Sequence, residues 1–304
     1  MNRTIGGDHV KNVILENEDR FSKALDRVAG ALLGGHAEKR PPRILRLSGP
    51  TCSGKTTAAK MLAERFARFG MQLHSVSLDD FFYNTEHLRA RSSGEGIDYD
   101  SEETLDLDEL MRFTDMIRNG REALCPIFNF KTGNREGFRT IRSGENDCFL
   151  FEGIQALYPG VERILSSCDD SEKSAVGIYI APMTPVSAGG EVFAPNELRL
   201  LRRLVRDYNF RATEPEFTLS LWSGVRNNEE LHIFPYIHTC EHWIDSSMTY
   251  EIGVLKPYLE QILARISKES PYRAEADSIL HQINGVTPIP KELIPSGSLY
   301  TEFI

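Results

Sequence analysis

The chain has 304 residues, 40% of them hydrophobic and 26% charged, which is the balance of an ordinary globular protein. Its formal net charge of −9 argues against general binding to nucleic acid or to a membrane surface, since both are polyanions. No stretch approaches the roughly 20 apolar residues of a membrane span, and the first residues lack the apolar core of a secretory signal. The five cysteines are scattered, which is typical of a reducing compartment. We therefore expect a cytoplasmic protein of enzyme size.

Residues 1–42 form the first of three predicted segments, a helix followed by a linker. Phe21, Leu25, Val28 and Leu32 recur at helical spacing, and a Pro-Pro pair at 41–42 ends the segment. We expect this helix to pack on the rest of the chain; binding to a partner is the alternative.

Strand and helix patterns alternate from residue 43 to 270, which predicts an α/β domain with a parallel sheet flanked by helices. Two strand-like runs around a Gly-rich turn predict a β-hairpin inserted within 124–143. Residues 271–304 are expected to form a C-terminal helix and a tail that packs over the surface of the domain. The expected strands are 43–48, 72–78, 148–152, 176–181 and 242–245, and the expected helices are 54–69, 105–119, 196–210, 213–224 and 256–268.

The most informative stretch is the sequence G-x-x-x-x-G-K-T from Gly49 to Thr56. Gly49 and Gly54 allow backbone angles and close approach that let successive N–H groups point at phosphate oxygens. Lys55 adds a charge for the β- and γ-phosphates, and the Thr56 hydroxyl is a ligand for Mg²⁺. A strand precedes the loop and a helix follows it, so the helix dipole points at the anion. The sequence predicts a nucleoside triphosphate site formed by Gly49, Thr51, Cys52, Ser53, Gly54, Lys55, Thr56 and Thr57.

Acidic residues follow two of the predicted strands. Asp79 and Asp80 come at the end of the second strand, and Glu152 ends the strand 148–152. Because ligands of open α/β sheets lie beyond the carboxyl ends of the strands, we expect at least one Asp to face the γ-phosphate and Glu152 to be directed at Mg²⁺. A carboxylate there can accept the proton of an attacking hydroxyl or support Mg²⁺. A solvated turn, a helix cap or an ordinary strand-end acid is the plain alternative.

A dense basic run lies on the helix expected at 196–210. An arginine run is usually a solvated helix face. In an acidic chain with a phosphate loop, we favour arginines that clamp phosphate oxygens as transition-state charge develops. The run comprises Arg199, Arg202, Arg203, Arg206 and Arg211.

Together these patterns resemble the uridine kinase and phosphoribulokinase family of phosphate-loop kinases. The resemblance covers about residues 43–270 and depends on several motifs in the family's order. It implies a P-loop NTPase fold of the nucleoside and nucleotide kinase type, with the inserted hairpin and a helical lid. The motifs are Gly49–Thr56, Leu78–Phe82, Tyr99–Ser101, Pro126–Gly133, Phe151–Ile154 and Arg199–Arg211.

The resemblance also implies roles, residue by residue. Asp79 matches the catalytic base, and Asp100 and Arg203 match residues that hold the sugar. Glu152 matches an acid associated with Mg²⁺, to which Thr56 and Asp79 would also contribute. The implied reaction is in-line transfer of the γ-phosphoryl group of ATP to an alcohol, with Lys55, Arg206 and Arg211 completing the catalytic set.

The departures from the family concern the base. In uridine kinases a Tyr, a His and a Gln recognise uracil, whereas this chain has Phe128, Gly133 and Leu221 at the matching positions. The resemblance therefore implies a nucleoside acceptor, with Phe128 in the substrate site, but not uridine. The base could stack on Phe128, Phe130 or Trp222.

Two other functions stay open at this point. A kinase of a non-nucleoside alcohol, such as a sugar phosphate or a pantothenate-like acid, could use the hairpin cations Lys131, Arg135, Arg139 and Arg142. A regulatory ATP-binding protein is the second, although it would not need a base and lid arginines. We expect a small-molecule substrate and no nucleic-acid or membrane partner. The family is often oligomeric, so a homo-oligomer also stays open.

Overall fold

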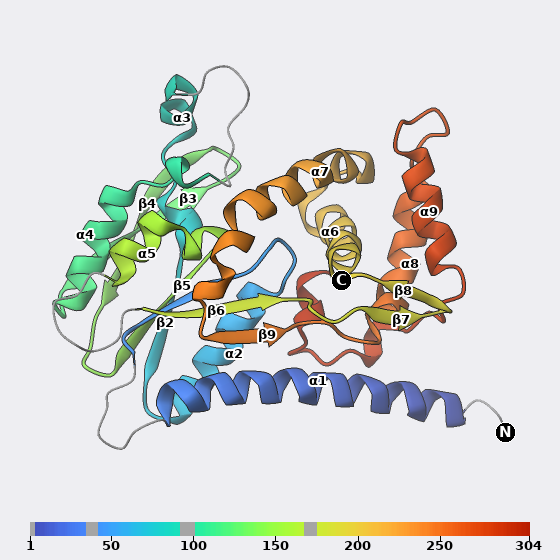
Figure 1. The fold of residues 1–304 in the computed structure, drawn as a ribbon, viewed down its shortest axis with the longest axis horizontal. Coiled ribbons are helices and arrows are strands. Elements are labelled where there is room, and N and C mark those ends of the chain that lie inside the picture. Colours follow the sequence, from blue (N-terminus) through green and yellow to red (C-terminus); the bar gives the residue numbers. More distant parts are fainter. Residues whose placement is uncertain (1–3, 35–41, 92–100, 167–174) are drawn as a thin grey trace.

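A computed structural model describes residues 4–34, 42–91, 101–166 and 175–304. Its centre is a parallel sheet with the strand order β2-β5-β1-β6-β9 (Figure 1). These five strands match the predicted ones to within a residue at each end, which confirms the α/β class. Their bounds are β1 (Ile44–Ser48), β2 (Gln72–Ser77), β5 (Asp147–Glu152), β6 (Val176–Ala181) and β9 (His242–Asp245).

Helices cover both faces of the sheet, because alternate side chains of each strand enter one of two hydrophobic cores. Leu45, Leu150 and Ile178 lie in the larger core, and Phe149 and Phe151 lie in the smaller one. The larger core contains residues of α1 (Thr4–Leu33), α2 (Lys55–Arg68), α6 (Pro195–Arg211), α7 (Pro215–His232), α8 (Glu251–Leu263) and α9 (Arg273–Ile283), and the smaller one contains residues of α4 (Leu107–Arg118) and α5 (Pro159–Ser166).

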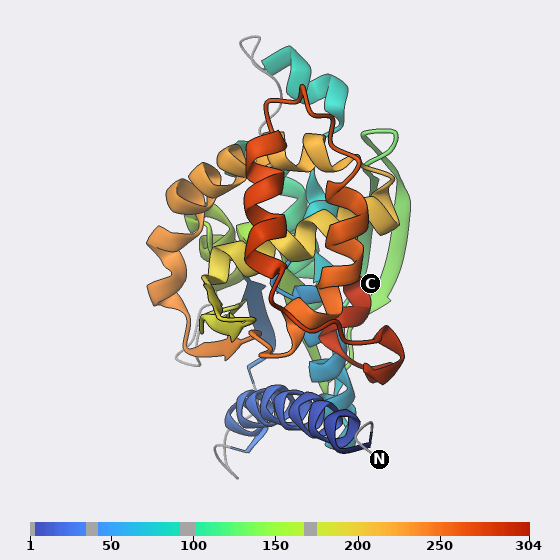
Figure 2. The same ribbon diagram turned by 90° about the vertical axis from the view of Figure 1, so that its right-hand side faces the viewer.

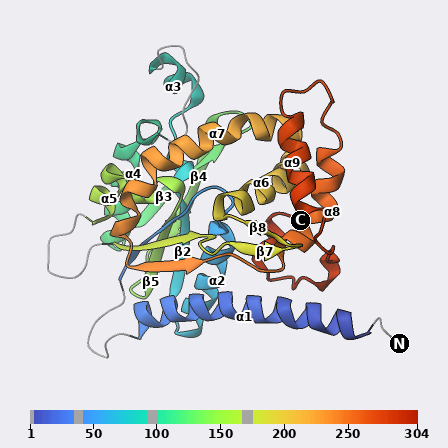
Figure 3. The ribbon, with the colours of Figure 1, turned by 45° about the vertical axis from the view of Figure 1, so that its right-hand side comes forward.

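The first helix packs on the domain, as expected. α1 runs along one side of the molecule in Figures 1 and 3, next to α2 and β9. Its predicted apolar residues are all buried. Polar contacts fix its position: Arg65 Nε lies 2.7 Å from the Asp26 carboxylate, and Asn17 and Thr249 exchange two hydrogen bonds. The Glu18 carboxylate accepts hydrogen bonds from Tyr250 and from Ser298 near the C-terminus.

The predicted hairpin is present as β3 (Glu122–Asn129) paired with β4 (Asn134–Arg142). Three elements are additional to the prediction: α3 (Thr85–Arg91), α5 and a small hairpin of β7 (Val186–Ala188) and β8 (Glu191–Phe193). Three helix bounds were also wrong: α7 continues past residue 224 to His232, and α8 begins at Glu251 and ends at Leu263, five residues earlier at each end than expected.

A helix interior can contain a proline where its lost hydrogen bond is replaced, and α8 shows how. Pro257 lacks the N–H that would bond to the Gly253 carbonyl. That carbonyl instead accepts a hydrogen bond of 2.9 Å from Ile289 N, on the tail that follows α9. The helix therefore continues through the proline, and Ile289 satisfies the exposed carbonyl.

The expectation that residues 284–304 lie over the surface was wrong for their last part. Figure 2 shows α8 and α9 side by side on one flank, and the tail continues from α9. A short 3₁₀ helix at Leu299–Glu302 then turns inward. Leu299, Tyr300 and Phe303 are fully buried in the larger core, so burial of these apolar side chains anchors the end of the tail.

Within the described ranges, every helix is too short or too polar to cross a membrane.

Candidate active site

The loop from Gly49 to Gly54 connects β1 to the start of α2, as the motif predicted. Cys52 and Gly54 have φ angles of 57° and 94°, in the left-handed region. A Cβ atom on Gly49 would lie 2.0 Å from the Ile180 carbonyl oxygen, so the loop can pass β6 only with glycine there. The loop thus presents its backbone at the N-terminus of α2, where N–H groups lack helical partners and favour anions.

The Lys55 side chain folds back across this loop. Its Nζ donates hydrogen bonds to the carbonyls of Gly49 (2.8 Å) and Pro50 (3.1 Å). Burial lowers the pKa of Lys55, while the nearby carboxylates of Glu152 and Asp79 act to raise it. The structure thus brings Lys55 close to Asp79 and Glu152, two acids that lie at the ends of different strands. The sequence predicted all three as site residues.

The strand register explains why these groups meet. Glu152 pairs with Leu47 of β1 on one side and with Ser77 of β2 on the other. Gly49 and Asp79 each lie two residues beyond those partners, so the phosphate loop, Glu152 and Asp79 share the carboxyl edge of three adjacent strands. This edge is where open α/β sheets bind ligands.

The predicted Mg²⁺ ligands fit the chemistry of that ion. The described residues contain no group of three or more His, Cys, Asp or Glu that could hold a metal by itself. Mg²⁺, however, commonly takes one or two carboxylates and completes its shell with water and substrate phosphates. Asp79, Glu152 and the Thr56 hydroxyl would supply such a partial set, and their role stays a prediction.

Asp80 contacts both strands of the hairpin. Its carboxylate accepts a hydrogen bond of 3.2 Å from Phe128 N and lies 3.7 Å from the Arg139 guanidinium. Burial raises the pKa of Asp80, against the opposing effects of these two partners. The end of β3 and the middle of β4 are therefore both connected to the residue that follows Asp79.

Two of the predicted arginines do not face the phosphate side. Arg199 is buried and bonded to both carboxylate oxygens of Glu229, and Arg202 is similarly bonded to Glu251. Each guanidinium also donates to a carbonyl of the phosphate loop, at Thr51 (3.4 Å) and Cys52 (3.2 Å). The expectation that they clamp phosphate was wrong, because both guanidiniums are buried, neutralised by carboxylates, and bonded to carbonyl groups of the loop.

The other three arginines gather at a single carboxylate. Asp207 lies 3.2 Å from Arg203, 2.7 Å from Arg206 and 3.7 Å from Arg211. The Asp207 side chain is buried, whereas Arg211 is largely exposed. Sequence analysis missed Asp207, although its position inside the basic run was the available signal.

The hairpin and α7 show which aromatic rings could meet an acceptor. Phe128 is buried against the rings of Phe82 and Phe130, and Trp222 is buried beneath the Arg199 guanidinium. Phe130 is 60% exposed, so it is the accessible one of the three predicted stacking residues. Asp100, the predicted sugar ligand, lies outside the described residues.

Gly133, the position expected to match the uracil-binding histidine of uridine kinases, lies in a tight contact with α3. Its φ angle is 68°, and a Cβ atom there would lie 2.1 Å from the Thr85 Oγ1 atom. The Gly133 carbonyl also accepts a 2.7 Å hydrogen bond from Thr85 N. A side chain at this position would therefore be strained by the positive φ angle and would require Thr85 to move.

A second acid that sequence analysis missed lies at the start of α2. Glu302 Oε1 accepts hydrogen bonds from Thr57 N (2.5 Å) and Thr57 Oγ1 (2.6 Å). No local pattern marks this contact, because the two residues are separated by most of the chain.

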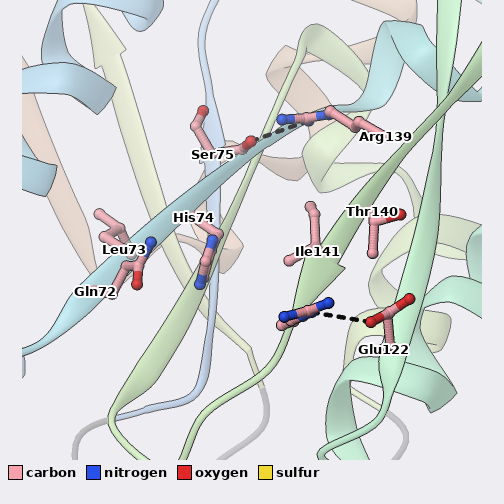
Figure 4. A pocket seen from close by; sticks show the side chains of 9 residues that line it. Gln72, Leu73, His74, Ser75, Glu122, Arg139, Thr140 and Ile141 are labelled. Carbon is pink, nitrogen blue, oxygen red and sulfur yellow. Dashed lines mark hydrogen bonds and ion pairs between the residues drawn. The ribbon is translucent and has the colours of Figure 1, made fainter.

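A groove of about 880 Å³ lies elsewhere, between the edge strand β2 and strand β4 (Figure 4). Arg139 crosses it to donate to the Ser75 carbonyl, at 3.2 Å. The groove contains neither the phosphate loop nor Asp79, so it is separate from the candidate active site. Its lining residues are Gln72, Leu73, His74, Ser75, Glu122, Arg139, Thr140, Ile141 and Arg142.

Comparison with known proteins identifies the family. The model of the phosphoribulokinase/uridine kinase family matches residues 44–252. This chain belongs to the phosphoribulokinase/uridine kinase family. The predicted resemblance is thereby confirmed, and the match leaves out α1, all of α8 after Ile252, α9 and the C-terminal tail.

Individual relatives of this family member are distant. A uridine kinase from Latilactobacillus sakei is 26% identical over 177 residues, which are 58% of this chain and 71% of the relative. A uridine kinase from Schizosaccharomyces pombe is 28% identical over 58% of this chain, but only 34% of the relative is covered. Among solved structures, YGR205w protein gives a TM-score of 0.51 at 15% identity over 71% of this chain and 89% of its own, a likeness of fold alone.

Proposed function

We propose that this family member is an ATP- and Mg²⁺-dependent kinase that phosphorylates a hydroxyl group of a small molecule. The convergence of Lys55, Asp79 and Glu152 at the phosphate loop is the observation that carries the proposal. A site that only binds nucleotide has no need of a carboxylate placed to accept a proton. The kinase relatives support phosphoryl transfer as the reaction class.

Each residue has a stated part in the proposed reaction. The loop N–H groups and Lys55 hold the phosphates, and Asp79 accepts the proton of the attacking hydroxyl. Thr56, Asp79 and Glu152 would hold Mg²⁺, and the ion would supply charge neutralisation at the phosphate oxygens. Arg206 and Arg211 stabilise the charge that develops during transfer, and Arg203 faces the acceptor.

We propose a nucleoside as the acceptor, with its 5′-hydroxyl attacking. We expect recognition of its base to differ from that of uridine kinases, since Gly133 supplies no side chain and a larger residue there would collide with Thr85. Phe128 and the partly exposed Leu221 also lack hydrogen-bonding side chains. A pocket without such groups cannot reject a wrong base by leaving a polar group unpaired, so we expect a broad or altered base preference.

A phosphorylated acceptor receives less support. Arg135 donates to the Asp106 carboxylate at 3.0 Å and to the carbonyls of Phe81 and Phe82. Arg142 is paired with Glu122, and Arg139 lies beside Asp80. Three of the four hairpin cations thus have partners within the protein.

The test is ADP release from ATP and Mg²⁺ with a panel of ribo- and deoxyribonucleosides, pantothenate and ribulose 5-phosphate. We expect turnover with a group of nucleosides and its loss in Asp79→Asn. Turnover with pantothenate or the sugar phosphate alone would overturn the nucleoside assignment. ADP binding without turnover on any compound would overturn the kinase assignment.

A further inference from the structure

The end of the chain occupies part of the phosphate-binding surface. Thr57 is the third residue of α2, so its N–H precedes the first intrahelical donor, the Ala58 N–H that bonds to Gly54 at 3.0 Å. It is one of the N–H groups that a phosphate loop offers to an anion. In this structure the Glu302 carboxylate accepts a hydrogen bond of 2.5 Å from this N–H, and it also accepts one from the Thr57 hydroxyl.

Glu302 reaches Thr57 because the residues around it are firmly anchored. The Leu299 side chain lies against the loop, so closely that a Cβ atom on Gly54 would be 1.9 Å from Leu299 Cδ1. The Arg202 guanidinium lies over the rings of Tyr300 (5.3 Å) and Phe303 (5.6 Å). These contacts hold the backbone of the tail beside the loop, on both sides of Glu302.

The charges around Glu302 are those that a nucleotide would use. Its carboxylate acts to raise the pKa of both Lys55 and Arg206. The same lysine and arginine are assigned to the phosphates in the proposed function. The Glu302 carboxylate and a phosphate oxygen of the nucleotide would therefore share the Thr57 N–H, Lys55 and Arg206 as partners. Because both groups are negatively charged, they repel one another and cannot occupy this place together.

We propose that the Glu302 carboxylate is an intramolecular competitor of the nucleotide, which must displace it from Thr57 to bind. The proposal rests on the proposed nucleotide site. It gives the C-terminal tail a regulatory role, because any condition that releases Glu302 raises the affinity for nucleotide. The tail lies outside the residues that the family model matches.

The test is calorimetric binding of Mg·ADP to the full chain and to Glu302→Gln and Glu302→Ala. We expect Kd to fall about three- to thirtyfold in the variants, the range expected when a side chain leaves a helix N-terminus. The melting temperature without nucleotide should fall at the same time, since Thr57 loses its partner. Glu292→Gln, an exposed glutamate of the same tail, is the matched control and should bind as wild type does.

The outcomes separate the two proposals. If the Glu302 variants have a lower melting temperature but an unchanged or higher Kd, the competition is overturned. Glu302 would then be a structural cap of α2, or its contact with Thr57 would persist when nucleotide is bound. An absence of ADP binding in wild type and in both variants would overturn the nucleotide site itself, and the competition with it.

Discussion

Arg206 donates two hydrogen bonds, of 3.0 and 2.7 Å, to a single oxygen of Asp207, the residue that follows it on α6. The other oxygen of Asp207 accepts from Arg203 at 3.2 Å and lies near the Thr218 hydroxyl. One buried carboxylate thus fixes the orientation of arginines assigned to both the acceptor and the phosphates. Preorganised cations cost no reorganisation when charge develops, which is how such groups contribute most to catalysis.

Asp207→Asn should therefore reduce kcat by about 10²-fold, because the arginines lose the group that orients them. The Kd for ADP should change much less. Steady-state kinetics and calorimetry measure the two effects. Asp277→Asn is the matched control, since Asp277 pairs with Arg273 on the exposed surface of α9, and it should leave kcat unchanged. An Asp207→Asn enzyme with wild-type kcat would contradict the assigned positioning role.

Asp79→Asn should lower kcat by at least about 10²-fold, the usual contribution of a general base, while Mg·ADP still binds. Lys55→Ala should instead weaken ADP binding, because the phosphate loop loses the lysine assigned to the β- and γ-phosphates. Single-turnover measurements at saturating ATP separate the two defects. Retention of rapid transfer in the Asp79 variant would require another base.

Glu251→Ala should lower the free energy of unfolding by about 3–5 kcal/mol, because Arg202 would be left as an uncompensated buried charge. Neither side chain of this pair is exposed to solvent. Glu214→Ala, which removes an exposed partner of Arg265, should cost no more than about 1 kcal/mol. Urea unfolding of both variants provides the comparison, and similar losses would argue against the importance of the buried pair.

Gly133→Ala should destabilise the protein by about 1–3 kcal/mol, since alanine is strained at positive φ and its Cβ would overlap Thr85. The acceptor KM should rise as the hairpin shifts, with little change in the KM for ATP. Thr85→Gly in the same chain should recover part of the stability by removing the overlap. Gly137→Ala on the same hairpin has open space and is the control. Independent, additive effects of the two substitutions would exclude the proposed contact.

The sheet and the core of the site were predictable because their signals are local. The glycine loop has fixed spacing, and each predicted acid lies at or just beyond the end of a strand, so parallel pairing brings Asp79 and Glu152 to one edge. Partners that are distant in sequence were not predictable. Nothing near Arg199 or Arg202 indicates that Glu229 and Glu251 will neutralise them in the interior. Short apolar runs punctuated by Gly and Pro, such as the one around Leu299, have no periodicity that indicates burial.

Glu18, on the first helix, accepts hydrogen bonds from Ser298, the residue that precedes the loop-contacting part of the tail. Residues near the two ends of the chain are therefore neighbours in space. Leu299, which follows Ser298, contacts the phosphate loop at Gly54. Changes made to α1 for practical purposes, such as a truncation to the family-matched residues or an affinity tag fused close to it, would alter the support of the tail. Enzyme prepared in that form would have a nucleotide affinity that differs from that of the full chain.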